Sequence, residues 1–334
     1  MGCVGMGEPV HRLMGVSPSL LKGSVVEKLL AMRRHFCHFN EARGGRTAVW
    51  YASGWFLQWH EGSAETVQAA WKASQTFRWL GAHRLVHQSE GQRGLAETLH
   101  IATVHSRETP ADVARRIHSV GRQHDLGWSA EPGEIWRQLT APCLLEGRDA
   151  MAAVARENVF AVTSENTGSV DLVRAIAEQH SADVVYQRFA GGELASPDVG
   201  AAYVDLSLGG QVTRVQALSR RALDNATVRM SLQQAQCLVL LLGNRAQAAE
   251  RLAHSIVDLL AEQDVWPAVR LVGHCAVSCE TAVRVLAAAL PQLDVAARFT
   301  DKSGRAPVDA VLEAVGNVRR GASTFVASRV SDLY

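Results

Sequence analysis

The second half of the chain alternates near-continuous apolar segments with amphipathic helical patterns, and this alternation constrains the fold more than any other feature. A strand that is apolar on both sides is buried on both faces. The alternation therefore predicts an α/β fold, a doubly wound and mostly parallel sheet whose ligand site would lie at the carboxyl ends of the strands. The expected strands cover residues 157–164, 201–208, 212–218, 236–243 and 268–275, and the expected helices 169–180, 247–263, 278–290 and 307–318.

The first half of the chain has a different order of elements. Shorter strands come in pairs, and amphipathic helical segments separate the pairs. The order βαββαββ predicts an α+β domain with an antiparallel or mixed sheet and helices on one face, the ferredoxin-like arrangement. The expected strands cover residues 11–17, 46–53, 54–62, 82–90 and 95–105, with helices at 25–39, 64–77 and 110–124.

Length and composition favour two domains. A chain of 334 residues exceeds the size at which one hydrophobic core usually keeps growing. Every tryptophan except Trp266 precedes residue 140, and prolines and glycines interrupt the stretch between the two halves. We expect a first domain over residues 10–125, a linker with one short helix over 126–154, a second domain over 155–320 and a tail over 321–334.

Charge and hydropathy exclude several functional classes. Lys plus Arg total 34 and Asp plus Glu total 33, so the chain has no general attraction to nucleic acid or to an anionic membrane. No stretch has the length of a membrane span and no secretory signal is visible, which predicts a cytoplasmic protein with free thiols. His274, Cys275 and Cys279 cluster locally, but a structural zinc site needs four ligands, and we expect no metal.

The run ASGWFLQWHEG at residues 52–62 resembles the third-strand signature of BLUF domains, the blue-light sensors that hold a flavin between two helices of a ferredoxin-like fold. The resemblance covers residues 10–105 and includes the element order and Asn40. In that family a glutamine on this strand hydrogen-bonds the flavin, a role that Gln58 fits. The resemblance also implies that Asn40 would bond a flavin carbonyl.

The sequence departs from the BLUF pattern at two places. The family has a tyrosine on its first strand that supplies the photochemical electron and proton, and this position falls near Gly15. Arg46 replaces part of a small-residue approach to the second strand, and we expect its long cation near the flavin cleft. Both changes imply a degenerate flavin site without a blue-light photocycle, so no cofactor is expected, with residual FAD as the alternative.

Other interpretations of these residues stay open. Asn40 would end the first helix, and Gln58 would be a polar strand residue bonded inside the domain. Tyr51 and the tryptophans Trp50, Trp55 and Trp59 are alternative electron donors whose faces the sequence does not settle. The spacing of Trp55 and Trp59 on one strand favours packing in the core or against a partner.

Residues 157–318 resemble small Ras-like GTPases of the bacterial polarity type, chiefly in element order and length. A P-loop uses glycine amides, a lysine and a Ser or Thr hydroxyl to hold phosphate and magnesium. In the corresponding stretch, residues 161–170, Thr163 replaces the first glycine, Gly168 keeps the second, Ser169 falls on the lysine and Val170 on the magnesium ligand.

The other landmarks of that family are missing as well. Residues 219–221, Ser-Arg-Arg, stand where a metal-binding Asp-x-x-Gly is expected, and residues 273–276, Gly-His-Cys-Ala, stand in place of the guanine-reading motif. The pattern implies a pseudo-GTPase. Gly168 and Ser169 would still offer helix amides to an anion or nucleotide. The alternative is that Ser169 is simply the N-cap of its helix.

The sequence as a whole predicts a non-enzymatic regulatory or scaffolding protein without catalytic residues. It would act on another protein, still unidentified, through protein contacts, and would bind neither nucleic acid nor a membrane; a homo-oligomer is possible. One alternative is a flavin-binding sensor with altered photochemistry that uses Asn40 and Gln58. A second is an atypical nucleotide-binding protein or hydrolase that uses Gly168 and Ser169.

Overall fold

The structure of the chain is a computed structural model, and it describes residues 9–22, 25–125, 130–145, 156–165, 168–190, 199–208, 211–299 and 306–320. The expected tail at 321–334 and most of the expected linker beyond residue 145 lie outside the described residues. Asn166 and Thr167 of the P-loop-like stretch lie outside them too.

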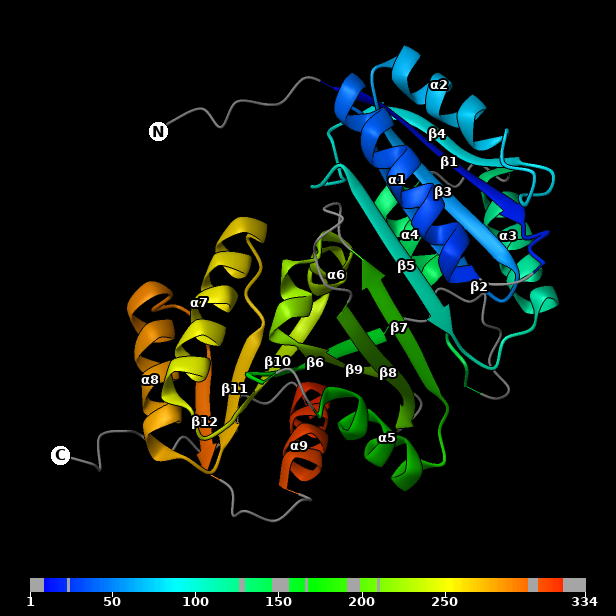
Figure 1. Cartoon of the computed structure of the whole chain (residues 1–334). Helices are drawn as coiled ribbons and strands as arrows, with labels where there is room; N and C mark the ends of the chain where they lie inside the picture. The colour runs from blue at the N-terminus through cyan, green and yellow to red at the C-terminus, as the bar shows by residue number, and fades with distance from the viewer. Residues whose placement is uncertain are drawn as a thin grey trace.

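The first half has the predicted βαββαββ order followed by a helix (Figure 1). Its hairpin turns at Ser53 and Gly54, both with positive φ (43° and 79°), as the sequence predicts. The elements are β1 (Val10–Pro18), α1 (Val25–Arg43), β2 (Arg46–Ala52), β3 (Trp55–Gly62), α2 (Ala64–Ser74), β4 (Arg84–Gly91), β5 (Leu99–His105) and α3 (Pro110–Asp125).

The second half follows after a short helix, α4 (Pro132–Thr140). All five expected strands and all four expected helices are present, and β7 and β12 are additional strands that the sequence did not predict. The elements are β6 (Arg156–Thr163), α5 (Ser169–His180), β7 (Val184–Ala190), β8 (Val199–Leu208), β9 (Gln211–Ser219), the 3₁₀ turn η1 (Arg220–Asp224), α6 (Ala226–Leu232), β10 (Ala235–Leu242), α7 (Ala246–Gln263), β11 (Ala268–Gly273), α8 (Ala276–Ala289), β12 (Val295–Phe299) and α9 (Ala306–Arg320).

One sheet runs through both halves. The described strands form a 12-stranded sheet in the order β12-β11-β10-β6-β9-β8-β7-β5-β2-β3-β1-β4. The neighbours from β12 to β9 are parallel, whereas β8 and β7 are antiparallel to their neighbours. Strand β7 also pairs antiparallel with β5, from Ile101↔Ala190 to His105↔Tyr186, and this pairing joins the two halves. The doubly wound, mostly parallel expectation therefore holds for β6 and β9 to β12, and the sheet as a whole is mixed.

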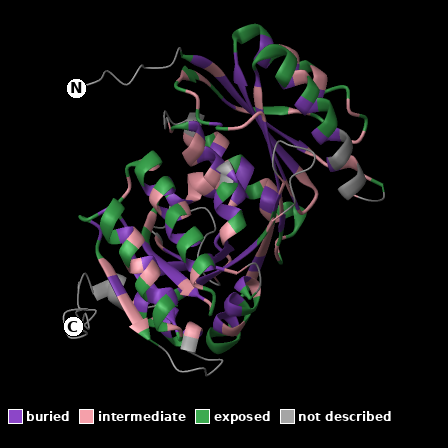
Figure 2. Ribbon diagram, turned by 60° about the vertical axis from the view of Figure 1, so that its left-hand side comes forward, coloured by how far each residue is buried: buried purple, intermediate pink, exposed green. Residues whose placement is uncertain are grey.

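The hydrophobic core follows the same continuity. The largest cluster of buried residues lies on one face and unites residues of α3 and α4 with residues of α7 and α8. On the opposite face, α1 and α2 cover the first half, while α5 and α9 cover the second. Figure 2 shows buried residues along the strands through both halves. Burial on both faces explains why the strands predicted in the second half are mostly apolar.

The segment expected to be a linker is part of this core. Ile135, Trp136 and Leu139 of α4 are each about 2% exposed, because their spacing puts them on one side of the helix. Arginines hold both ends of the segment: Arg12 pairs with Glu131 at 2.8 Å, and Arg214 donates to the Pro142 carbonyl at 2.9 Å. Helix α4 therefore packs as a structural element. The domain boundaries themselves stay a prediction.

Candidate functional site

Strand β3 presents two different faces, because successive side chains alternate along a strand. Phe56, Gln58 and His60 point to the side covered by α1 and α2, as Phe56 belongs to the cluster packed under these helices. Leu57 and Trp59 belong to the cluster on the α3 and α4 side. Gln58 thus lies on the face that the BLUF resemblance assigns to a flavin, and it is 1% exposed.

Asn40 lies on the same side as Gln58 but is held by the chain itself. Its Nδ2 donates to Thr47 Oγ1 at 3.0 Å and to the Thr98 carbonyl at 2.8 Å. The expectation that Asn40 ends the first helix is wrong. Helix α1 continues to Arg43, and Gly44 follows with a positive φ of 63°, a conformation that costs glycine least.

His60 continues this network and was missed by the sequence analysis. Its Nδ1 lies 3.0 Å from Thr47 Oγ1. The same oxygen accepts from Asn40 Nδ2, and it lies 3.4 Å from Asn40 Oδ1, so Asn40, Thr47 and His60 form one buried polar cluster. Burial lowers the pKa of His60 to about 3, with a further contribution from His83. The imidazole is therefore neutral at pH 7.

Several buried polar atoms on this face have no hydrogen-bond partner among the described residues. Ser17 Oγ on β1, opposite Phe56, is one of them, and Gln58 Oε1 and His60 Nε2 form a pair on β3. An unsatisfied buried polar group costs about 1–3 kcal/mol, so native proteins seldom leave one without a reason. The pair is the strongest indication of a polar recognition site in this half.

The position opposite Gln58 carries no phenol, as the sequence predicts. Gly15 of β1 is the register partner of Gln58 on β3. A methyl group added at Gly15 would overlap the six-membered ring of Trp71, which reaches over from α2. The chain fills this place with an indole where the BLUF family has a tyrosine on the first strand.

The expectation that Arg46 lies near the flavin cleft is wrong. Arg46 pairs with Glu61 across β2 and β3, and Glu61 lies on the same face of β3 as Trp59. Because Trp59 packs on the α3 and α4 side, Arg46 points to that side, away from Gln58. The Arg46 guanidinium donates to the Leu95 carbonyl there.

Glu61 is a second charged residue that the sequence analysis left unassigned. Its carboxylate is 1% exposed and accepts from the Gly94 amide at 3.0 Å and the Leu95 amide at 2.9 Å. Burial raises the pKa of Glu61, and these amide hydrogen bonds oppose the rise. The cluster fixes the loop before β5 onto β3.

The alternative electron donors separate by face. Trp50 and Trp59 belong to the core on the α3 and α4 side, where Trp59 meets Trp136 at 5.9 Å between ring centroids. This confirms packing for Trp59; Trp55 packs against the same core. Tyr51 lies on the α1 and α2 face but pairs with Phe56, two residues along β3 from Gln58. Trp71 was not singled out from the sequence, although its ring lies against Gly15, the register partner of Gln58.

In the second half, the structure brings Gly168 and Ser169 to the start of α5. Gly168 is the N-cap, with a positive φ of 87°, and its carbonyl accepts from the Leu172 amide at 3.1 Å. The interpretation of Ser169 as the N-cap is therefore wrong by one residue. A left-handed cap suits glycine, and Ser169 occupies the first helical turn, 6% exposed.

A cavity of about 510 Å³ lies where the sequence places a ligand site, at the carboxyl ends of β6, β10 and β11. Glu165 and Asp171 are acidic residues of its lining, and Arg245 Nε donates to Glu165 Oε1 at 3.1 Å. Among the described residues that line it, none is a lysine or arginine, and His274 is the only basic side chain. A phosphate in a P-loop is normally held by a lysine.

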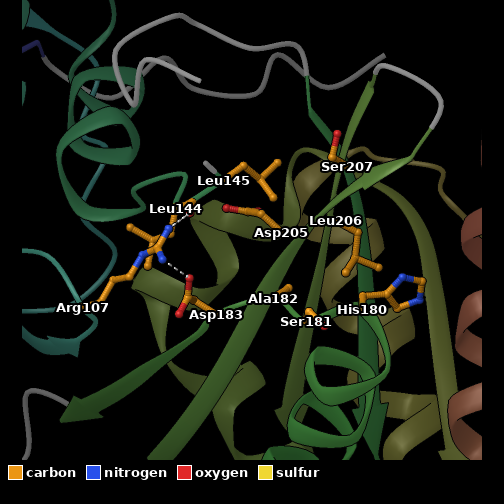
Figure 3. A pocket seen from close by; sticks show the side chains of 10 residues that line it. All are labelled: Arg107, Leu144, Leu145, His180, Ser181, Ala182, Asp183, Asp205, Leu206 and Ser207. Atoms are coloured by element: carbon orange, nitrogen blue, oxygen red, sulfur yellow. Dashed lines mark hydrogen bonds and ion pairs between the residues drawn. The ribbon is translucent and has the colours of Figure 1, made fainter. Parts of the chain in front are cut away.

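A smaller cavity of about 410 Å³ lies at the junction of the two halves, between the ends of β5 and β8 and the start of β7. Figure 3 shows Arg107 reaching across it, with its guanidinium 2.7 Å from Asp183 and also bonded to the Leu144 carbonyl. Asp205 of the lining is paired with buried Arg214 through two contacts of 2.8 Å. The charges of this cavity are satisfied within the chain.

No protein-family model matches this sequence, and no curated protein matches it. Similar solved structures include BlsA in its ground state, with 17% identity and a TM-score of 0.28 over 34% of this chain and 73% of that one. The dark state of BlrB, a BLUF protein, has 14% identity and a TM-score of 0.27 over 28% of this chain and 72% of that one.

A bacterial light-regulated adenylyl cyclase is also similar, with 13% identity and a TM-score of 0.28 over 66% of this chain and 64% of that one. These likenesses are weak. They extend at most to a BLUF-like part of the chain, and they assign neither a cofactor nor an activity to it.

The cysteines of the described segments form no metal site. Cys37, Cys143, Cys237, Cys275 and Cys279 are free thiols, and burial raises the pKa of Cys279 to about 11. No group of three or more metal-ligating side chains occurs among the described residues. Within the same residues, no helix combines the length and the apolarity needed to cross a bilayer.

Proposed function

We propose that this chain is a non-enzymatic regulatory or scaffolding protein that acts through contacts with another protein. The observation that carries the proposal is that its own side chains take up the place beside Gln58. The Trp71 ring covers Gly15, directly across from Gln58, where the resembled family uses a tyrosine beside the flavin. A flavin does not fit this arrangement as it stands, because its ring system would compete with the indole.

The second half supports the same proposal as a pseudo-GTPase. Glu165 stands at the strand end beside Gly243, paired with Arg245, and Asp171 follows in the first turn of α5. A carboxylate close to the helix start opposes a phosphate, whose binding normally needs a lysine and magnesium. The preserved core would then serve folding and surface presentation, with no nucleotide chemistry.

The continuous sheet also suits a role in protein contacts. Strand β5 pairs with β7, and α4 belongs to the core shared by both halves, so the two halves form one continuous structure. A partner could therefore contact the surfaces of both halves at once. Inter-domain motion is then limited to what a shared sheet allows. A partner or a second copy would bind to a preformed arrangement of both halves.

A flavin-binding sensor with altered photochemistry is the second candidate function. It is favoured by Gln58 Oε1, a buried acceptor that has no partner among the residues the structure describes, on the face covered by α1 and α2. Asn40 contributes less, since both protons of its amide nitrogen are already donated to Thr47 and Thr98. The protein would need to move Trp71 before a ring could approach Gln58.

The test is to purify the full chain and assay GTP hydrolysis with magnesium, alongside the visible absorption of the preparation. The proposal predicts no turnover and no yellow colour. In the native cell, cross-linking should then join the chain to a partner whose activity changes when the chain is added back. Magnesium-dependent turnover that is lost in Ser169→Ala would contradict the non-enzymatic proposal, and bound flavin would favour the sensor.

A further inference from the structure

Two thiols lie one helical turn apart at the start of α8. Cys275 is the N-cap of this helix, and the Cys279 amide donates to its carbonyl at 3.1 Å. Residues four apart in a helical turn lie on the same side of it, one above the other. The Cys279 sulfur also lies against Gly273, where an added Cβ atom would come within 3.1 Å of it. Because Gly273 precedes Cys275 by two residues, both thiols lie at the connection between β11 and α8.

The two thiols differ in their access to solvent and in their acidity. Among the cysteines that the structure describes, Cys275 alone is partly exposed, and the buried ones are Cys37, Cys143, Cys237 and Cys279. The Ser278 hydroxyl, together with the Ser278 and Val277 amides, lowers the pKa of Cys275. Burial raises the pKa of Cys279 to about 11, and the nearby Cys275 adds to the rise. Since the thiolate is the reactive form, a dissolved oxidant reacts first with Cys275.

A bond between the two sulfurs requires the first turn of α8 to change. Cβ atoms of residues four apart in a helix are about 5–6 Å apart. A disulfide needs a separation of about 3.5–4.5 Å. Cys275 has room to make this approach, because its backbone at the N-cap lies outside the helical region (φ −107°, ψ 111°). The approach distorts the hydrogen bond from the Cys279 amide to the Cys275 carbonyl.

The chain directly before Cys275 forms part of a cavity wall. Gly273 and His274 line the cavity of about 510 Å³ in the second half, and Cys275 is the next residue. A change at the N-cap of α8 is therefore passed to this wall through the backbone. The thiol pair lies where its chemical state alters the shape of a cavity.

We propose that Cys275 and Cys279 form a peroxide-sensitive thiol pair, in which Cys275 reacts with the peroxide and Cys279 closes a reversible disulfide with it. The Cys275 thiolate attacks one oxygen of hydrogen peroxide and the O–O bond breaks. The leaving hydroxide takes up a proton, and Cys275 becomes a sulfenic acid. The Cys279 thiol then attacks the Cys275 sulfur, the S–S bond forms and the S–O bond breaks, and water leaves with the thiol proton. The two thiols lose two electrons, and one peroxide is reduced to two waters.

This inference goes beyond the proposed function, because it gives the second half a redox input. It requires neither a flavin nor a nucleotide nor a protein partner. The oxidised pair holds the first turn of α8 in a changed shape, and thiol reductants restore the original one.

The experiment treats the reduced full chain with excess hydrogen peroxide, blocks the remaining thiols with N-ethylmaleimide and digests the chain with trypsin. Both cysteines fall in one peptide, residues 271–284, since trypsin cleaves after Arg270 and Arg284. We expect mass spectrometry to find this peptide unlabelled and lighter by two hydrogen atoms. Dithiothreitol before blocking should restore two labelled thiols. Oxidation should also speed hydrogen exchange of the Cys279 amide.

Three variants assign the roles of the two thiols. In Cys279→Ser, oxidation should stop at a sulfenic acid on Cys275, which dimedone traps. In Cys275→Ser, Cys279 should react at least about tenfold more slowly than Cys275 does in the unmodified chain. Cys237→Ala is the matched control, because Cys237 is also buried with its pKa raised to about 11. It should form the disulfide at the unmodified rate.

The unmodified chain tests the pair even if a variant does not fold, and circular dichroism establishes the folding of each variant. Two labelled thiols in peptide 271–284 after peroxide treatment would overturn the inference, as would a disulfide from either residue to a third cysteine. Oxidation of Cys275 to a sulfinic acid without a disulfide would overturn the role of Cys279. None of these results involves a partner, so failure here is distinguishable from failure of the regulatory proposal.

Discussion

Gly15 is the residue whose identity the fold needs most in the first half, because the Trp71 ring rests on its backbone. We expect Gly15→Ala to lower the free energy of unfolding by about 1–3 kcal/mol, since the added methyl displaces the ring or shifts α2. Urea titration followed by circular dichroism measures the change. In the Trp71→Ala background the same substitution should cost far less. Equal costs in both backgrounds would show that the two residues are not coupled.

His60 gives the first half a pH-dependent stability. Its pKa is lowered to about 3 in the folded chain. Between about pH 6.5 and pH 3, His60 is therefore protonated in the unfolded chain and neutral in the folded chain. The stability contributed by neutral His60 is thus present above that window and is lost as the pH falls through it. We expect a loss of about 2 kcal/mol between pH 7 and pH 5 from this group. Urea titrations of His60→Gln at both values should show a smaller difference, and an unchanged one would contradict the assignment.

In the second half, the Arg214 guanidinium is a buried charge. It pairs with Asp205 through two contacts, lies 3.9 Å from the centroid of the Tyr203 ring and donates to the Pro142 carbonyl. We expect Arg214→Met to cost about 3–5 kcal/mol, because it leaves the Asp205 carboxylate buried without its cation. Arg245→Met is the control. Its exposed pair with Glu165 should contribute about 0–1 kcal/mol, and similar losses for both variants would contradict the ranking.

At the scale of elements, α4 joins parts of the chain that are far apart in sequence. Trp136 packs against Trp59 of β3, and the carbonyls that follow α4 are held by Arg214 of β9. We expect Trp136→Ala to cost about 3–5 kcal/mol and to speed amide exchange in β3 and in β9 together. Faster exchange in only one of these strands would show that α4 belongs to one half.

Most elements could be predicted from the sequence because their periodicity is local. Apolar runs predict five strands of the second half, and the Ser53-Gly54 turn predicts the first hairpin. Strand β7 was missed because it mixes Gln187 and Arg188 with apolar residues, and it is a strand only where β5 and β8 offer their edges. Strand β12 has only five residues. Both depend on neighbours that the local pattern does not show.

The candidate site was predictable in part for the same reason. Alternation along β3 placed Gln58 on one face, and Gly15 marked the missing phenol. The position of Arg46 needed the register of β2 against β3, and the contact of Trp71 with Gly15 needed the packing of α2 on the sheet. The hydrogen bonds of Asn40 join residues up to 58 positions apart. No single stretch of sequence carries that information.

At the scale of the whole molecule, the shared sheet makes the halves depend on each other. A fragment of residues 155–320 should keep its parallel strands, as the domain proposal requires, but β7 would lose β5, and the Tyr203 hydroxyl would lose the Pro142 carbonyl. We therefore expect the fragment to unfold at a lower urea concentration than the same strands in the full chain. Far-ultraviolet circular dichroism measures the urea midpoints of the fragment and of the full chain. Equal midpoints would mean that the shared sheet contributes no stability.

The proposal for the whole molecule is that neither candidate site holds a ligand, because Trp71 covers Gly15 beside Gln58 and acidic side chains line the cavity of the second half. Native mass spectrometry of the full chain, purified gently from cells that contain flavins and nucleotides, tests both sites in one spectrum. The account predicts the mass of the polypeptide alone, or whole multiples of it if the chain associates with itself. A stoichiometric additional mass equal to that of a flavin or a guanine nucleotide would contradict it.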